Sequence, residues 1–355
     1  MVRHLANRHS TVAATAAFAL SLLITSNARL AGAQGCEPIR FTAPVSLGGQ
    51  GEAYQRSREW QLTLAYRYLN SNDFFVGTTN STTAISPSFR IHTLVANAAY
   101  AINDRWNISA SLPFSKGTQT SYGADKVFHE QRATGTGDLS IIGEGWVLEP
   151  RAHGRGNVAV AIGVKAPTGS HTIGTQLYSA DGATTDFPAS QTVQPGDGGW
   201  ALLLQSRAFR QLTDRTHLYA FGSYMVSPKA QSDVRERPNG LYWSVPDGYS
   251  ARTGLSYALL PDRDLSVSLG GRIDGTPVHD LVGGGDDVTV KRPAYVILAD
   301  PGLSMGIGEG RMTMSVPYRV RVNRLRSVVD EKNGSPPVGG GFAKYLLFLS
   351  YSHPL

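Results

Sequence analysis

Hydrophobic and polar residues alternate along most of this 355-residue chain, and this alternation constrains the fold more than any other feature. Successive side chains of a β-strand point to opposite faces, so the pattern predicts strands that each have one apolar face. In residues 60–69, for example, Trp60, Leu62 and Leu64 share one face, and Gln61 and Thr63 share the other. Twelve such segments are predicted, near 60–69, 89–102, 105–115, 137–148, 157–167, 199–211, 216–227, 249–260, 264–274, 293–305, 310–323 and 341–353.

The connections between these segments alternate between short and long. The short ones lie near 103–104, 149–156, 213–215, 261–263 and 306–309. The long ones lie near 70–88, 116–136, 168–198, 228–248, 275–292 and 324–340. An outer-membrane barrel has short turns at its periplasmic end and long loops at the other, whereas a soluble sandwich has no reason to alternate. The sequence therefore predicts an all-β, transmembrane, antiparallel up-and-down β-barrel of about 12 strands, with both termini periplasmic.

Composition excludes the main competing classes. Charged residues make up only 17% of the chain, whereas a disordered chain needs high charge and few apolar residues. The single cysteine cannot support a disulfide scaffold. After residue 30 no segment approaches the ~20 apolar residues of a spanning helix. Most predicted strands reach the ~9–11 residues that cross a bilayer, and closure into a barrel leaves no unpaired edge in lipid.

The N-terminus has the pattern of a secretory signal peptide. Arg3 and Arg8 precede an apolar stretch at 12–24, and Ala31-Gly32-Ala33 is a small-residue cleavage pattern. We therefore expect a signal peptide at 1–33, a periplasmic segment at 34–59 that could fold as a plug, and the barrel at 60–355. Cleavage would also lower the net charge from +6 to +3, because three arginines and no acid are removed. Nucleic acid is therefore not an expected partner.

Two further features of the chain agree with an outer-membrane location. Trp60, Tyr100 and Trp106 lie near predicted strand ends, where aromatic girdles form. The last predicted strand carries an apolar face and is expected to engage the barrel-assembly machinery, although the chain ends in Leu355 rather than an aromatic residue. Cys36 follows the predicted cleavage site, and it is either a lipid attachment point or a lone thiol.

The polar strand faces are predicted to line a lumen that is richer in bases than in acids. The predicted lumen-lining residues are Arg67, Asp138, Glu144, Lys165, Arg207, Arg252, Arg272, Asp300, Arg311, Arg319, Arg321 and Lys344. A basic interior would favour anions. Alternatively, these residues pair with one another or with an inward-folded segment and fill the barrel. Eight strands are filled by side chains and 16–18 leave a water channel, so twelve predict a narrow or closed lumen.

No catalytic or metal site is predicted. The nine histidines are scattered without metal-ligand spacing, and no phosphate-binding loop is present. Ser170-His171 is the one arrangement that resembles a nucleophile pair, but loop neighbours do not present the geometry of a triad. The stretch Leu281–Val288, which contains Gly283–Asp287, could bind a cation at an outer loop, but a solvated loop is favoured because its ligands are fewer than six. We expect neither enzyme activity nor a cofactor.

Three glycine-rich stretches look like motifs of a known family. Gly135-Thr136-Gly137-Asp138-Leu139 opens one predicted strand, Val164-Lys165-Ala166-Pro167-Thr168-Gly169 closes the next, and Pro195-Gly196-Asp197-Gly198-Gly199 leads into a third. In this order they resemble bacterial outer-membrane barrels grouped as "meta-pathway of phenol degradation" transporter-like proteins. The resemblance covers about residues 58–355 and implies a twelve-stranded barrel that moves small, often aromatic, hydrophobic compounds.

The physical reason for these motifs is that glycine and Pro-Thr-Gly permit bends and strand exits at the rim. Asp138 and Lys165 lie on adjacent predicted strands and are expected to pair inside. The third motif has Asp197-Gly198 where the family pattern often has Gly-Ser.

The sequence thus predicts an outer-membrane channel for passive passage of small solutes, either hydrophobic and aromatic or anionic. Its predicted partners are outer-membrane lipid, lipopolysaccharide and a small solute. The alternative is a closed structural or surface-binding barrel that acts through its long loops without transport.

Overall fold

The computed structural model describes residues 54–238, 240–283 and 288–355. The predicted signal peptide, Cys36 and most of the segment 34–59 lie outside these described residues. Residues 284–287 of the candidate cation-binding stretch lie outside them as well.

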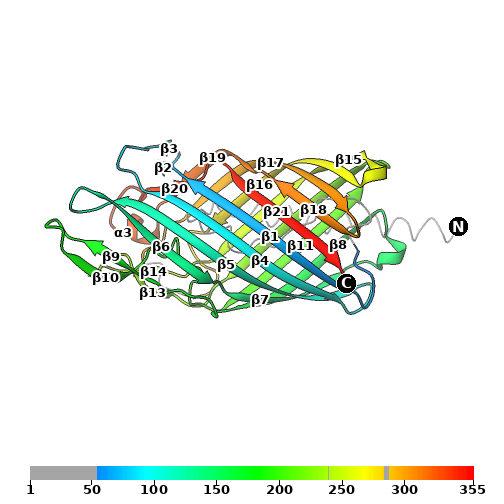
Figure 1. The fold of residues 1–355 in the computed structure, drawn as a ribbon, viewed down its shortest axis with the longest axis horizontal. Helices are drawn as coiled ribbons and strands as arrows, with labels where there is room; N and C mark the ends of the chain where they lie inside the picture. The colour runs from blue at the N-terminus through cyan, green and yellow to red at the C-terminus, as the bar shows by residue number, and fades with distance from the viewer. Residues whose placement is uncertain (1–53, 239, 284–287) are drawn as a thin grey trace.

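Fourteen strands form one antiparallel sheet that closes into a twelve-stranded barrel, which confirms the predicted fold class (Figure 1). Closure is complete because β1 pairs with both β4 and β21, and β16 pairs with β17. The barrel strands are β1 (Trp60–Ser71), β4 (Ser88–Ala101), β5 (Trp106–Tyr122), β6 (Phe128–Thr136), β7 (Leu139–Trp146), β8 (Gly156–Ala166), β11 (Ala201–Gln211), β12 (Thr216–Val226), β15 (Gly248–Leu260), β16 (Leu265–Thr276), β17 (Ala294–Ile307), β18 (Gly310–Ser315), β19 (Tyr318–Arg324) and β21 (Leu346–Pro354).

Short turns lie at one end of the barrel, which we call the turn end, and long connections lie at the other, the loop end. The first and last barrel strands also meet at the turn end, where Leu355 N–H donates to the carbonyl oxygen of Trp60 at 2.8 Å. The turn-end connections include the 3₁₀ turns η2 (Pro150–Ala152) and η3 (Pro261–Arg263). The loop-end connections contain β2 (Asp73–Val76), β3 (Thr79–Asn80), β9 (Gly174–Tyr178), β10 (Thr184–Pro188), β13 (Gln231–Arg235), β14 (Tyr242–Ser244), α3 (Val328–Lys332) and β20 (Gly340–Phe342).

Two barrel strands are interrupted rather than continuous. One predicted strand, 310–323, breaks at Pro317 into β18 and β19, because proline has no N–H to donate to the sheet. The other break separates β6 from β7 at Gly137 and Asp138, where Gly137 N–H donates to the carbonyl oxygen of Pro113 on β5. Odd-numbered residues face inward on β6 and even-numbered ones on β7, whereas Ser315 and Arg319 both face inward across the break at Pro317.

The prediction of a long loop at 116–136 is wrong. Strand β5 continues to Tyr122 and β6 returns from Phe128, so only a five-residue connection remains and the hairpin stands out at the loop end (Figure 1). The extension has no alternating pattern, because Ser, Thr and Gln occupy both of its faces. This is the pattern of a hairpin with polar surroundings on both sides.

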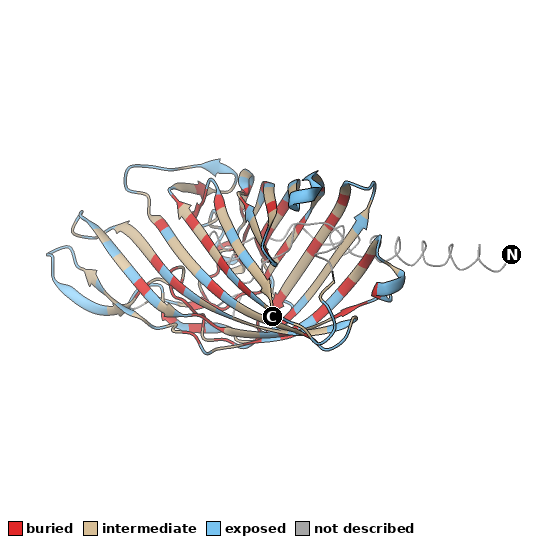
Figure 2. Ribbon diagram, turned by 45° about the vertical axis from the view of Figure 1, so that its right-hand side comes forward, coloured by how far each residue is buried: buried red, intermediate tan, exposed pale blue. Residues whose placement is uncertain are grey.

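Buried positions alternate with more exposed ones along the barrel strands (Figure 2). The exposed positions on the outer face are largely apolar. On β8, Val160 and Ile162 are 52% and 60% exposed, whereas their neighbour Ala159 is completely buried. At the turn end, the rings of Trp60 and Tyr100 lie 4.9 Å apart. Among the described residues, no helix is both long and apolar enough to cross a membrane.

Candidate functional site

Most of the predicted lumen-lining residues lie on the inner face of the barrel. Their positions follow from strand pairing, since residues paired across neighbouring strands share a face. Arg67, for instance, pairs with Thr93 and Phe348 and is only 6% exposed, whereas its strand neighbours alternate to the outer face. The residues with inner-face positions are Arg67, Glu144, Lys165, Arg207, Arg252, Arg272, Asp300, Arg311 and Arg319.

Arg321 does not line the lumen. The pairing of β17 with β19 shifts register so that Leu298 faces Arg319 and Ile297 faces Arg321, which leaves Val320 as an extra residue. This β-bulge turns Arg321 to the exposed outer face, and Val322 becomes the next buried position. A strictly alternating reading of the sequence could not find the bulge.

Lys344 also departs from the prediction. The last barrel strand begins at Leu346 rather than near residue 341, because Gly340–Phe342 pairs with β2 in a separate small sheet. Lys344 therefore lies in the bend before the barrel strand. It is exposed, and its ammonium lies 6.0 Å from the ring centroid of Tyr318, an exposed residue.

The three glycine-rich stretches meet at one junction around Lys165. The ammonium of Lys165 donates to Asp138 at 3.0 Å, to Asp197, and to the carbonyl oxygen of Gly199 at 2.8 Å. All three charged side chains are buried. The predicted pairing of Asp138 with Lys165 is therefore confirmed, and Asp197 joins it from the loop that connects β8 to β11.

The backbone at this junction is packed so closely that glycine is required. A Cβ on Gly169 would lie 2.6 Å from the carbonyl carbon of Gly137, and one on Gly196 would lie 3.1 Å from Gly169. Asp138 fixes the crossing, because its carboxylate accepts from the backbone N–H of both Gly169 and Asp197. Sequence reasoning found the motifs, whereas their mutual contact required the fold.

Most of the inward bases have an acidic partner. The Arg207 guanidinium donates to Glu144 at 2.8 Å, and Arg252 and Arg272 lie 2.8 Å from Asp300 and Asp274. Arg319 pairs with Asp73 of β2. Sequence reasoning missed the partners Asp73, Asp197 and Asp274, although Asp274 has the same strand parity as Arg272 and could have been found. These contacts support the interpretation in which the lumen charges neutralise one another.

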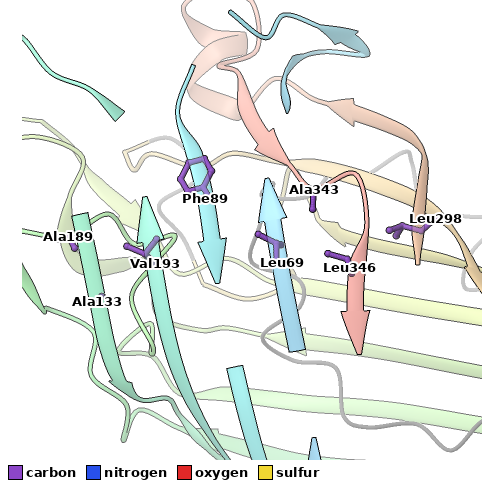
Figure 3. Close-up of a cluster of buried hydrophobic side chains, with 8 residues drawn as sticks. All are labelled: Leu69, Phe89, Ala133, Ala189, Val193, Leu298, Ala343 and Leu346. Atoms are coloured by element: carbon purple, nitrogen blue, oxygen red, sulfur yellow. The ribbon is translucent and has the colours of Figure 1, made fainter. Parts of the chain in front are cut away.

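Toward the loop end, the lumen also holds an apolar cluster (Figure 3). It lies beside the charges, since its member Leu298 pairs with Arg272 and Arg319 on the neighbouring strands. We call this set the apolar collar, because its members come from inner-face positions around the barrel and from the loop before β11. The collar consists of Leu69, Phe89, Ala133, Ala189, Val193, Leu298, Ala343 and Leu346. Ile91, Ile173, Val296 and Phe348 pack against it. No member was predicted as a site residue.

The loop segment 189–199 folds inward and completes the collar. Val193 approaches β5 so closely that a Cβ on Gly117 would lie 2.8 Å from the Cβ of Val193. The side chain of Gln194 holds the segment by donating to the carbonyl oxygens of Ala189 and Ile173 and by accepting from Ile173 N–H. An inward-folded segment therefore fills part of the lumen, and it comes from the third long connection.

The Ser170-His171 pair does not form a nucleophile site. The His171 ring nitrogens lie 3.1 Å from the Gly169 carbonyl oxygen and 3.0 Å from the Asp233 carboxylate, so both face partners other than Ser170. Across the described part of the chain, no three His, Cys, Asp or Glu side chains gather as a metal site would require. The buried groups at this site are therefore those of a packed, neutralised lumen.

Comparison with known proteins supports the fold. No model of a protein family and no curated protein matches the sequence. The crystal structure of the COG4313 outer membrane channel from Pseudomonas putida F1 has a TM-score of 0.60 and 12% identity, covering 88% of this chain and 100% of that one. The P. putida toluene transporter TodX has a TM-score of 0.41 and 8% identity, with 84% and 90% covered. That score is too low to carry an argument.

At 12% identity the similarity to the P. putida channel shows the barrel fold alone. The family suggested by the three motifs remains a prediction. What the geometry itself provides is a barrel whose lumen holds an apolar cluster toward the loop end and, around and below it, charges that mostly neutralise one another.

Proposed function

We propose that this protein is an outer-membrane channel for passive passage of small hydrophobic solutes, aromatic ones included. The observation that carries the proposal is the apolar collar. Its side chains fill the lumen toward the loop end with hydrocarbon, so that a solute entering from outside would pass between them. An apolar solute crossing there replaces one set of van der Waals contacts with another, whereas an ion would have to shed its water.

Two further observations agree with this proposal. Most of the inward bases are paired with acids, so a selective path for anions has little support. The similar solved structure with a TM-score of 0.60 is named as an outer membrane channel. A closed barrel that acts only through its loops is the less favoured alternative.

The proposal places the turn end, with both chain termini, in the periplasm. Short turns on the periplasmic side and long loops outside are the rule for bacterial barrels. The test is a Ser335→Cys variant, since Ser335 lies in the connection between α3 and β20 at the loop end. In intact cells a membrane-impermeant maleimide should label this thiol but not an Asp214→Cys variant at the turn end. The reverse labelling would overturn the orientation.

Transport is best tested in cells, because the outer leaflet, and not a simple phospholipid bilayer, is the barrier to apolar solutes. A Gram-negative host expressing the protein should take up the apolar dye N-phenylnaphthylamine faster than the same host without it. Val193→Asp should lower this gain about tenfold by placing a charge in the collar. Val338→Asp, at an exposed apolar residue of the loop end, is the matched control and should leave uptake unchanged.

Three results would contradict the proposal. One is dye uptake that is no faster with the protein than without it. The second is an equal effect of both substitutions at equal expression. The third is a larger gain in flux for an anionic probe such as nitrocefin, which would indicate an anion path instead.

A further inference from the structure

Three cationic residues gather on the outer face of the barrel at the loop end. They are Arg90 of β4, Lys116 of β5 and Arg132 of β6, which are neighbouring strands. Pairing fixes their direction, because Lys116 lies opposite His92, and Arg90 and Arg132 lie on either side of Thr118. All of these positions share the face of Leu94 and Phe114, which are exposed apolar residues of the outer surface. The three cations are exposed as well.

The patch carries a net positive charge. Arg132 forms an ion pair with Glu130, an exposed contact. No carboxylate of the described residues lies within ion-pair distance of Arg90 or Lys116. Among the described barrel strands, the other outward cations are Arg321 on β19 and Arg210 near the turn end of β11, and neither has a cationic neighbour on an adjacent strand. The patch is therefore a local concentration of charge.

The height of the patch matches the outer edge of a membrane. Lys116 lies ten positions along β5 from Trp106, and Arg90 lies ten positions along β4 from Tyr100, both aromatic residues of the turn end. Ten residues span about 34 Å along a strand, which at a tilt of ~40° is about 26 Å of height, close to the ~25 Å apolar band of such barrels. With the aromatic residues at one interface, the cations lie at the other.

The row below Lys116 is apolar on β4 and β5, where Leu94 lies opposite Phe114. Leu94 is followed by His92 and Arg90 along β4, and Phe114 is followed by Lys116 along β5. A molecule bound here would place hydrocarbon against Leu94 and Phe114 and anionic groups against the guanidinium and ammonium. Free phosphate could use only the upper half of this surface.

We propose that Arg90, Lys116 and Arg132 form a binding site for the phosphate groups of an outer-leaflet glycolipid, lipid A of lipopolysaccharide. Guanidinium and ammonium groups donate charge-assisted hydrogen bonds to phosphate. The acyl chains of the same molecule cover the apolar rows of β4 and β5. This site is independent of transport through the lumen and requires only that the loop end faces the outer leaflet, which the Ser335→Cys labelling tests separately.

The experiment measures lipid binding by native mass spectrometry of the full protein in detergent. Bisphosphorylated lipid A should bind, and the double variant R90Q/K116Q should weaken its binding about tenfold. Arg210→Gln removes an exposed, outward cation at the opposite end and should not change binding. The charge-retaining variant R90K/K116R should preserve most of the affinity, which separates loss of charge from loss of folding.

Two further measurements distinguish the phosphates of lipid A from free phosphate as the ligand. Lipid A stripped of both phosphates should bind the wild-type protein at least tenfold more weakly than bisphosphorylated lipid A does. It should bind the wild-type protein and R90Q/K116Q equally weakly. Equal binding of the two lipid forms, or an unchanged affinity of R90Q/K116Q, would overturn the proposal. Displacement by inorganic phosphate that exceeds displacement by chloride at equal ionic strength would assign the patch to free phosphate and overturn the lipid assignment.

Discussion

Two sets of residues in the lumen are held by different interactions. The apolar collar near the loop end is held by van der Waals contacts among aliphatic side chains and Phe89. The buried charges around and below it, which we call the charged layer, have specific partners, such as Asp300 for Arg252. Apolar contacts can be exchanged for contacts with a solute at small cost, whereas a buried ion that loses its partner is strongly destabilised. The collar is therefore suited to admit solutes and the charged layer to keep its shape.

The largest effect is expected from breaking the charged side of this comparison. Lys165→Met leaves Asp138 and Asp197 buried without their cation and should lower the free energy of unfolding by about 3–5 kcal/mol. Urea unfolding of the protein in lipid vesicles measures this. The triple variant that also carries Asp138→Asn and Asp197→Asn should recover part of the loss. If Lys165→Met alone costs under 1 kcal/mol, the junction does not depend on this ion pairing.

A smaller loss is expected from the collar. Leu298→Ala should lower the free energy of unfolding by about 2–4 kcal/mol, because it removes a buried side chain and leaves a cavity. Unlike Val193→Asp, it should leave dye uptake unchanged or make it faster, since the collar becomes wider and stays apolar. Slower uptake by a folded Leu298→Ala protein would show that the collar is not the path.

The bulge at Val320 supplies a sharper test within one strand. Arg319→Gln removes the cation that pairs with Asp73 and should cost about 1–3 kcal/mol. Arg321→Gln changes an exposed outer residue and should cost less than about 0.5 kcal/mol. The same unfolding assay compares both. Equal costs would mean that the two arginines face the same side and that the bulge is absent.

The smallest effect is expected from the ion pair between Asp280 and Lys291, which lies in a connection at the loop end. Burial raises the pKa of Asp280 to about 6, even though the Lys291 ammonium lies 2.8 Å away. A raised pKa means that the folded state holds the proton more tightly than the unfolded state does. The stabilisation is therefore complete below about pH 4 and is lost as pH rises through about 6.

Hydrogen exchange at residues 277–283, corrected for intrinsic rates, should consequently be faster at pH 7.5 than at pH 4.5. Asp280→Asn should remove this difference. A pH dependence that persists in the variant would assign it to another group.

Some strands can be predicted from the sequence more accurately than others. Strand β8 was predicted almost to the residue, because Val158–Val164 alternate with small or polar residues against lipid. The extension of β5 to Tyr122 was not predicted, because above the apolar band both faces are polar. The bulge at Val320 displaced Arg321 to the outer face, since one extra residue shifts the alternation by one position.

The sequence by itself determined the number of barrel strands, the alternation of turns and loops, and which strand faces are apolar. These are local properties, since the bilayer requires a period of two and a fixed strand length. Apart from the pair of Asp138 and Lys165, only the tertiary structure decided which charges meet. The partners Asp73 and Arg319 are far apart in the chain, and the inward position of Val193 depends on Gly117 of another strand. Contacts of this kind arise because closing the barrel brings distant segments into one narrow lumen, and no local pattern encodes them.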